Sequence, residues 1–147
     1  LAFAAAASIG NKVYVFGGWT GEACSNVLQG LDVVTDMWEP VESLTSQPPS
    51  PRMGHSMVAV GPKLFVYGGK NKEGQVFADL RAYDTTTDHW EMIQGRGDIP
   101  RERWGHSSFL WGRLLMLGLG AEGDKDGETN AISMYNLDTN YWESWDG

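Results

Sequence analysis

Cysteine, histidine, basic charge and long apolar runs are all scarce in this sequence, and each shortage excludes a class of protein. The 147 residues include one Cys and three His, too few for a disulfide framework or a zinc ribbon. No run of about 18 apolar residues is present, which argues against a membrane-spanning helix. Eleven Lys and Arg stand against 19 Asp and Glu, giving a formal net charge of −8. Nucleic acid is therefore not an expected partner, because its binding normally needs a basic surface.

The first ten residues bear on where the protein resides. This segment, LAFAAAASIG, is apolar but has no basic leader, and strand-like sequence follows it at once. It does not have the layout of a secretory signal peptide. Together with the single unpaired Cys, this predicts a reducing compartment and a cytoplasmic protein. Because the chain begins with Leu and not Met, we expect it to be part of something longer.

A repeat of about fifty residues runs along the whole chain. Trp38, Trp90 and Trp142 are separated by two equal steps of 52 residues. Three further features keep nearly the same period: a polar stretch leading to each Trp, an apolar stretch ending in Gly, and an Arg-x-Gly-His-Ser motif in two copies. These stretches are DVVTDMW (32–38), DTTTDHW (84–90), NLDTNYW (136–142), VYVFGG (13–18), LFVYGG (64–69), LLMLGLG (114–120), RMGHS (52–56) and RWGHS (103–107).

Each repeat unit is predicted to form strands and no helices. Stretches such as 56–60, 64–67 and 77–83 are rich in β-branched and aromatic residues, which favour strands. Gly, Asn, Asp and Pro, the residues typical of turns, bound them. No segment keeps a 3.6-residue apolar period for long. We therefore predict four strands per unit and an all-β fold.

The order Arg-x-Gly-His-Ser, Gly-Gly, Asp-x-x-Thr-x-x-Trp resembles the kelch repeat, the four-stranded blade of a β-propeller. The resemblance implies a kelch-type propeller fragment with three four-stranded blades, from repeats 1–51, 52–102 and 103–147. Propellers typically need about four to eight blades to close. We therefore expect a partial propeller whose remaining blades come from the parent chain or from another copy.

The repeated residues are expected to build the scaffold. The three Trp that end each copy are predicted to fill the space between adjacent blades. His55 and His106 both belong to a repeated Gly-His-Ser. A catalytic group is usually unique, so we predict a structural hydrogen bond for each His.

Partner contacts are instead expected on loops that differ between copies. With strands named a to d from the central channel outward, as the resemblance implies, the b–c loops and d–a connections emerge on one face, here called the loop face. It receives five of the eleven basic residues. In kelch adaptors partners commonly dock on this face, and the resemblance implies these candidate contacts: Trp19, Arg52, Met53, Lys70, Asn71, Arg101, Arg103 and Trp104.

The expected partner is a protein, in particular an acidic peptide segment. Arg and Trp are frequent in binding hot spots, and the Arg fork suits carboxylates. Arg52 and Arg103 belong to the repeat. For these two residues, bracing of the inter-blade connection is therefore an alternative of equal weight to partner binding. Lys70, Arg101 and Trp19 occur in one copy only and carry more of the hypothesis.

Two alternatives to a binding module remain open. One is a propeller enzyme of the galactose-oxidase or nitrile-specifier kind, and the other is a structural subunit of a large complex. No Tyr, His and Cys set converges on one face, and no Glu-x-x-x-Asp-x-x-x-His run is present. We therefore predict no catalytic residue, no metal site and no cofactor. The acidic segment 121–128 is expected to be a solvated loop and not a calcium site, because the terminal Glu of such a site is missing.

Overall fold

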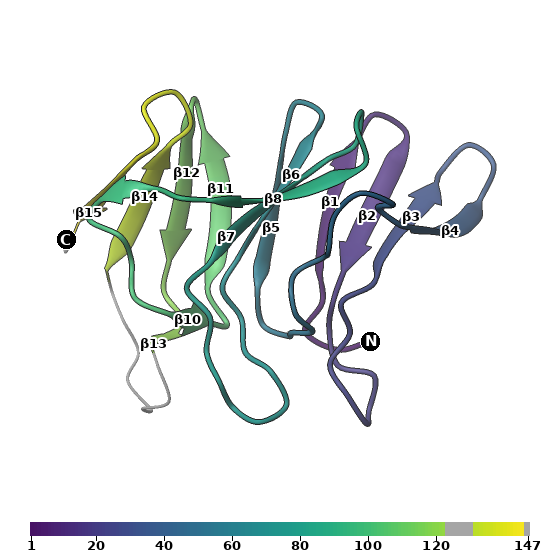
Figure 1. The fold of residues 1–147 in the computed structure, drawn as a ribbon, viewed down its shortest axis with the longest axis horizontal. Coiled ribbons are helices and arrows are strands. Elements are labelled where there is room, and N and C mark those ends of the chain that lie inside the picture. The colour runs from purple at the N-terminus through teal and green to yellow at the C-terminus, as the bar shows by residue number, and fades with distance from the viewer. Residues whose placement is uncertain (123–130, 146–147) are drawn as a thin grey trace.

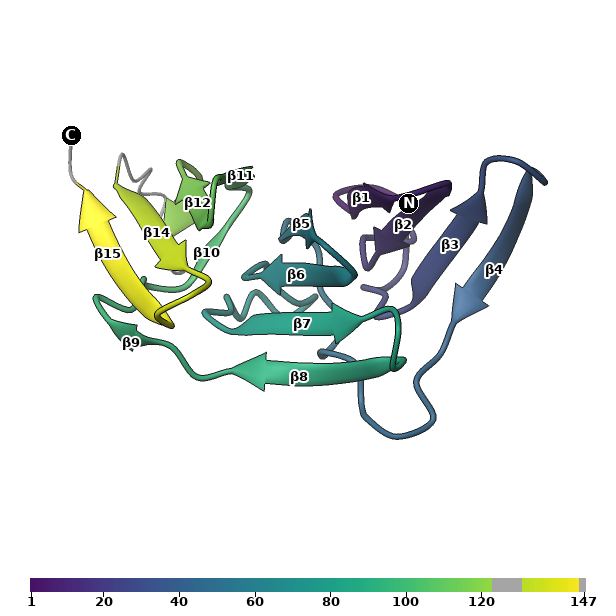
Figure 2. The same ribbon diagram turned by 90° about the horizontal axis from the view of Figure 1, so that it is seen from above.

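The computed structural model describes residues 1–122 and 131–145, which form three antiparallel four-stranded sheets fanned about a common axis (Figures 1 and 2). Blade 1 contains β1 (Ala5–Ile9), β2 (Lys12–Phe16), β3 (Leu28–Asp32) and β4 (Met37–Val41). Blade 2 contains β5 (Ser56–Val60), β6 (Lys63–Tyr67), β7 (Leu80–Asp84) and β8 (His89–Ile93). Blade 3 contains β11 (Ser107–Trp111), β12 (Leu114–Gly118), β14 (Ile132–Asn136) and β15 (Tyr141–Trp145). The predicted all-β, kelch-type fold is confirmed.

Three shorter strands accompany the blades. The d–a connection after blade 2 forms β9 (Arg96–Gly97), which adds a parallel fifth strand to the outer edge of blade 3 beside β15. The pair β10 (Arg103–Trp104) and β13 (Ala121–Glu122) lies below blade 3. From residue 123 on, the predicted acidic loop lies outside the described residues. Among the described residues, no helix is long and apolar enough to cross a membrane.

The polar stretch before each Trp forms the hairpin between strands c and d. In blade 2, Asp84 Oδ1 accepts a hydrogen bond from Thr86 N at 2.8 Å, and in blade 1 Asp32 Oδ1 accepts one from Val34 N. Asp88 then has a φ of 53°, a left-handed conformation that Asp and Asn tolerate. Its carboxylate accepts a hydrogen bond from Tyr83 Oη at 2.6 Å. The repeated polar residues are therefore explained by the turn geometry.

One strand boundary differs from the prediction. The third strand of blade 2 was expected over 77–83, but β7 begins at Leu80. Phe77 belongs to the loop, where its N–H donates to Gly69 O and its carbonyl accepts from Arg103 N. These bonds tie the loop to its own blade and to blade 3, so the backbone of Phe77 is not available for a strand ladder.

The core consists of two interfaces between blades. In each, an aromatic ring at the end of strand b meets the Trp of the following blade: Phe16 and Trp90 have ring centroids 5.2 Å apart, and Tyr67 and Trp142 are 5.7 Å apart. The first interface buries Tyr14, Phe16, Leu28, Met57, Leu64, Val66, Tyr83 and Trp90. The second buries Phe65, Tyr67, Leu80, Ala82, Leu115, Leu117, Tyr135 and Trp142.

The two outermost blades each leave one apolar face uncovered. Trp38 of blade 1 is 52% exposed, whereas its counterparts Trp90 and Trp142 are 5% and 4% exposed. On blade 3, Phe109 and Trp111 are 57% and 68% exposed. The predicted inter-blade role of the Trp therefore holds where the described chain supplies a preceding blade.

This difference gives a matched pair of variants for testing the interface. We expect Trp90→Ala to lower the free energy of unfolding of the chain by roughly 3–5 kcal/mol, because it leaves a cavity between blades 1 and 2. Trp38→Ala removes the same side chain from an uncovered face and should cost less than about 1 kcal/mol. Urea unfolding followed by circular dichroism measures both values. Equal losses for the two variants would contradict this account of the core.

Candidate functional site

The b–c loops lie on one face of the molecule, as the alternating directions of the strands require. The β2–β3 and β6–β7 loops, which are b–c loops, lie together at the lower edge of the molecule in Figure 1, whereas the a–b turns point the other way. Each b–c loop begins with a short bridge to the segment before strand a of its own blade. Trp19 bridges Ala2 in blade 1, Lys70 bridges Met53 in blade 2, and Ala121 pairs with Trp104 in blade 3. The loop face is therefore built on one repeated backbone frame.

Arg52 is buried within this frame. Its side chain is 1% exposed, and the structure gives its five guanidinium N–H groups five hydrogen-bond contacts. Nη1 donates to Asp79 Oδ1 at 2.6 Å and to Gly68 O at 3.0 Å, and Nη2 donates to Asp79 Oδ2 at 3.0 Å and to Ser50 Oγ at 3.2 Å. Nε donates to Ser50 O. The two bonds to Asp79 form a bidentate ion pair. Burial of the carboxyl raises the pKa of Asp79, but Arg52 and Arg81, whose Nε lies 2.9 Å from Asp79 Oδ2, outweigh it and hold that pKa below its usual value.

Arg103 occupies the same place in blade 3 with weaker partners. It is also 1% exposed, and its Nη2 lies 3.6 Å from the carboxylate of Glu122. Its Nη groups donate to Ala131 O and Ser133 Oγ at 3.4 and 3.3 Å. Within the described residues its Nε has no hydrogen-bond partner. Both Arg side chains therefore brace their own blade and present no guanidinium to the surface.

Three of the candidate residues come together directly. The ammonium of Lys70 lies 3.4 Å from the centroid of the Trp104 ring, a cation–π contact between blades 2 and 3. The backbones of Lys70 and Met53 exchange two hydrogen bonds of 2.9 Å. All three side chains are half-buried. The structure thus fixes a cation on an aromatic ring at the loop face.

The other candidates lie farther along the same loops. Trp19 is half-buried in the frame of blade 1. Asn71 closes the β6–β7 loop by accepting a hydrogen bond from Gln75 N at 2.9 Å. Arg101 is exposed, and its carbonyl accepts a hydrogen bond from Tyr67 Oη. These three residues therefore belong to the same loops as the Lys70–Trp104 pair but take no part in its cation–π contact.

The loop face is less basic than the five basic residues assigned to it from the sequence indicate. Of the five basic residues assigned to the loop face, the two repeated Arg are buried, which leaves Lys70, Lys72 and Arg101. Glu73 and Glu102 follow Lys72 and Arg101 directly in the sequence. The face therefore presents separate cations among carboxylates and not one continuous positive surface.

The two repeated His side chains connect neighbouring blades. Nε2 of His55 lies 2.7 Å from the carbonyl of Phe16, and its ring meets the Phe16 ring edge-on at 5.3 Å. Nε2 of His106 lies 2.8 Å from Ser56 Oγ, and its ring contacts Tyr67 in the same manner. Nδ1 of each ring is buried with no hydrogen-bond partner among the described residues. The predicted structural role is what this geometry supports.

These contacts also explain the paired glycines that end strand b. A Cβ on Gly17 would lie 2.5 Å from Cε1 of His55 and 2.9 Å from the carbonyl of Arg52. A Cβ on Gly68 would lie 2.5 Å from the carbonyl of Arg103. Both glycines have a φ near 70°, which a side chain rarely adopts. The third copy has Leu119 at this place, 59% exposed, on the uncovered face of blade 3.

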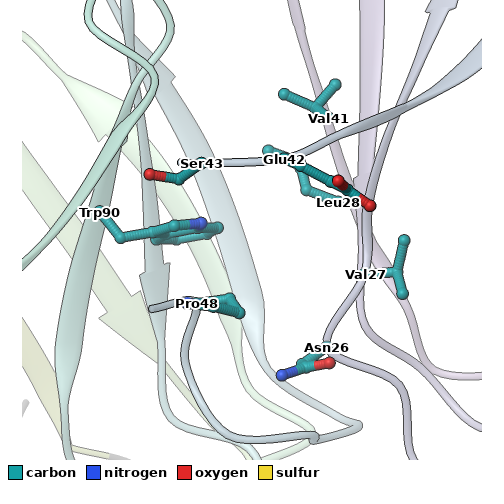
Figure 3. Close-up of a pocket in the computed structure, with 8 residues that line it drawn as sticks. All are labelled: Asn26, Val27, Leu28, Val41, Glu42, Ser43, Pro48 and Trp90. Carbon is teal, nitrogen blue, oxygen red and sulfur yellow. The ribbon is translucent and has the colours of Figure 1, made fainter. Parts of the chain in front are cut away.

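Two hollows lie beside this frame. One, of about 240 Å³, opens between blades 1 and 2, with Trp90 on one wall and Leu28 and Val41 on the other (Figure 3). The other, of about 250 Å³, lies on the loop face between the b–c loops of the same blades. It is lined by Ala23, Cys24, Ser50, Pro51, Asn71, Lys72 and Glu73. Over the described ranges, no three His, Cys, Asp or Glu side chains gather closely enough to hold a metal ion.

The role of Asp79 and the loop-face hollow were not predicted from the sequence. Asp79 stands at a repeat position where the other copies have Val27 and Ala131, so the repeat pattern gives no signal for it. The hollow combines residues from three separate segments, and no single motif marks it.

The buried histidines predict a dependence of stability on pH. Burial lowers the pKa of His55 and of His106 to about 4, against about 6.5 in the unfolded chain. The unfolded state then binds more protons below pH 6.5, so the free energy of unfolding should fall by on the order of 2 kcal/mol per histidine between pH 7.5 and pH 5. Urea titrations at both values should show this loss reduced in His55→Gln. The control His89→Gln changes an exposed ring and should leave it intact; an unchanged loss in His55→Gln would refute the assignment.

Comparison with known proteins agrees with this architecture. The profile of the KLHDC2/KLHL20/DRC7 Kelch-repeats domain matches residues 2–146. Kelch domain-containing protein 3 of Homo sapiens is 30% identical over 150 residues, which cover 94% of this chain and 39% of that protein. Acyl-CoA-binding domain-containing protein 4 of Arabidopsis thaliana is 30% identical over 150 residues, covering 96% of this chain and 22% of that protein.

An enzyme is also among the relatives. N-(sulfonatooxy)prop-2-enimidothioate sulfolyase of Thlaspi arvense is 38% identical over 147 residues, which cover 92% of this chain and 41% of the enzyme. The chain thus spans less than half the length of each of these relatives. The repeat, the blades and the matched profile together show that the chain belongs to the kelch-repeat family.

Proposed function

We propose that this chain is a protein-binding module and that its partner docks on the loop face around Lys70 and Trp104. The observation that carries the proposal is the cation–π contact of 3.4 Å between these side chains. Lys70 and Trp104 come from different blades, and neither is repeated: Trp19 and Ala121 stand at the position of Lys70 in the other copies. Scaffold formation therefore does not explain why a cation and a ring meet here.

The properties of this pair suit a binding hot spot. Trp is among the residues most enriched in such spots, and it acts best when its surroundings exclude water. Trp104 is half-buried, and the ammonium on its ring is already positioned, so little side-chain entropy is lost on binding. Met53, Asn71, Arg101 and Trp19 complete the proposed surface, whereas Arg52 and Arg103 act from below as braces.

The proposed partner segment is acidic, and its carboxylates are spaced. Lys70, Lys72 and Arg101 are the basic side chains of the expected set that reach the surface. Because Glu73 and Glu102 stand next to two of them in sequence, a continuous run of carboxylates would also meet repulsion. Alternating acidic and neutral residues fit this arrangement better.

The remaining blades belong to the same proposal. Trp38, Phe109 and Trp111 leave apolar faces at both ends of the fan, and exposed patches of this kind mark contact surfaces. We propose that further blades, from the parent chain or from another copy, cover them. The loop face would then continue around a closed ring, with this chain supplying three of its blades.

Peptide selection against the immobilised chain tests the docking surface. Selected peptides should bind with an affinity that Trp104→Ala and Lys70→Glu each lower by tenfold or more, or about 1.4 kcal/mol. Lys63→Glu changes a cation in the a–b turn, on the opposite face, and should leave the affinity unchanged. Fluorescence anisotropy of labelled peptides gives these values. If Lys63→Glu abolished binding while the two loop-face variants retained it, the docking surface would be wrong.

An enzyme is the second candidate because of the sulfolyase relative in Thlaspi arvense. The Glu-x-x-x-Asp-x-x-x-His run expected of an iron-dependent specifier is not present in this sequence. Metal analysis of the purified chain separates the two candidates: for a binding module we expect less than one-tenth equivalent of iron or copper. A stoichiometric amount of either metal would favour the enzyme. A structural subunit would instead yield cross-links to fixed neighbours without selecting peptides.

A further inference from the structure

Ser50 is the one Ser or Thr in the sequence that is followed by Pro, within the segment Gln47-Pro-Pro-Ser-Pro51. This segment lies in the d–a connection between blades 1 and 2 and belongs to no strand. Ser50 and Pro51 are both exposed. A Ser-Pro pair in an exposed loop is the substrate pattern of proline-directed protein kinases. We propose that Ser50 is a phosphorylation site and that its phosphate occupies the loop-face hollow beside Arg52 and Lys72.

The hollow offers donors on two sides of Ser50. Ser50 lines it together with Asn71 and Lys72 of the β6–β7 loop. Its volume of about 250 Å³ is ample for a phosphate group. Glu73 also lines the hollow and opposes an anion there, but Lys72 offsets its charge. The ammonium of Lys72 and the side-chain amide of Asn71 are both groups that bind phosphate oxygens.

Arg52 provides a further donor from below. Its Nη2 already donates to Ser50 Oγ at 3.2 Å. A phosphate on Oγ would place acidic oxygens near this N–H and replace a neutral acceptor by a charged one. Asp79 holds the other side of the guanidinium, so the Arg stays in position. The third copy differs here because Arg101 stands at the place of Ser50.

The covalent step is an ordinary phosphoryl transfer from MgATP, catalysed by the kinase. The Ser50 Oγ attacks the γ-phosphorus, an O–P bond forms, and the bond between the γ-phosphorus and the β,γ-bridging oxygen breaks, so ADP leaves. The hydroxyl proton passes to the catalytic carboxylate of the kinase. To reach its active site, the segment must release the hydrogen bonds from Asn26 Nδ2 to Pro49 O and from Arg52 N to Ser25 O. Opening of such a loop needs no rupture of a sheet.

Phosphorylation would change the charge of the loop face by about −1.5 to −2 at pH 7. Asn71 and Lys72 directly follow the proposed docking residue Lys70 in the sequence, so the phosphate would compete with an acidic partner for the ammonium of Lys72. This consequence for partner binding rests on the proposed function. The modification and the seating of the phosphate do not, and the experiment measures these two alone.

The first measurement is phosphate incorporation into the folded chain by a recombinant proline-directed kinase with MgATP. Mass spectrometry should find one phosphate per chain, on Ser50, and none in Ser50→Ala. A peptide of residues 44–54 serves as the unfolded substrate. If the peptide is phosphorylated while the folded chain is not, the structure shields Ser50 and the proposal fails. It also fails if neither substrate is phosphorylated.

The second measurement is the pKa of the phosphate in the modified chain, by ³¹P NMR titration. Nearby Arg52 and Lys72 should lower the second pKa by at least half a unit from the peptide value of about 6. Lys72→Ala should restore at least half of this shift, whereas Lys12→Ala, an exposed cation on the opposite face, should leave it unchanged. A pKa equal to that of the phosphorylated peptide would show that the phosphate does not occupy the hollow.

Discussion

The contact between the ring at the end of strand b and the Trp of the next blade holds the fan of blades together. Strands of five residues make small sheets, and a small isolated sheet buries too little apolar surface to offset its loss of conformational entropy. Stacking two sheets buries a continuous layer between them. Phe16 with Trp90 and Tyr67 with Trp142 are the centre of these layers. Each blade is therefore stabilised by its neighbour. The sequence pattern repeats once per blade, but a single blade is not stable without the blade beside it.

The polar part of the repeat follows from the same contact. Once two sheets lie this close, the His of the later blade contacts the earlier blade, either at the backbone of its strand b or at the Ser of its strand a. The residue directly after strand b must then be a glycine, because a Cβ there would collide with the later blade. The requirement holds only where a following blade is present. Leu119 illustrates this: it stands at the place of Gly68 with a φ of 62°, on a face that no described blade covers. A blade docking there with the same geometry would bring a carbonyl oxygen against its Cβ, so the backbone of that blade must differ locally.

Periodicity made the fold predictable, whereas the side-chain contacts on the loop face depend on features without a period. Trp38, Trp90 and Trp142 recur at one interval, and from them the four-stranded blades could be predicted before any coordinates were considered. The bidentate bond between Arg52 and Asp79 could not be predicted in this way. Asp79 has no acidic counterpart in the other copies, and it contacts Arg52 only after the b–c loop folds back. The cation–π pair joins two blades across 34 residues of sequence, and sequence reasoning named both partners without indicating their contact. Position in a repeat predicts the backbone frame, but side-chain pairing on that frame depends on the loops.

Comparison of equivalent positions then shows how one scaffold acquires a specific surface. Arg52 and Arg103 have the same burial, yet the first is fully paired and the second lacks a bond at Nε within the described residues. Asp79, which binds both Nη groups of Arg52, is replaced by Ala131, and Ser50, whose carbonyl accepts from Nε of Arg52, is replaced by Arg101. A buried guanidinium with fewer partners stabilises its loop less. A further position of the same backbone frame carries different side chains in different blades. Trp19 and Ala121 stand at the place of Lys70. Since the frame fixes where each side chain emerges, substitution at these few positions changes charge and shape on the loop face without disturbing the inter-blade core. The residues that differ between blades are therefore physically separate from the residues that hold the blades together: the first lie on the loop face, and the second lie in the inter-blade core.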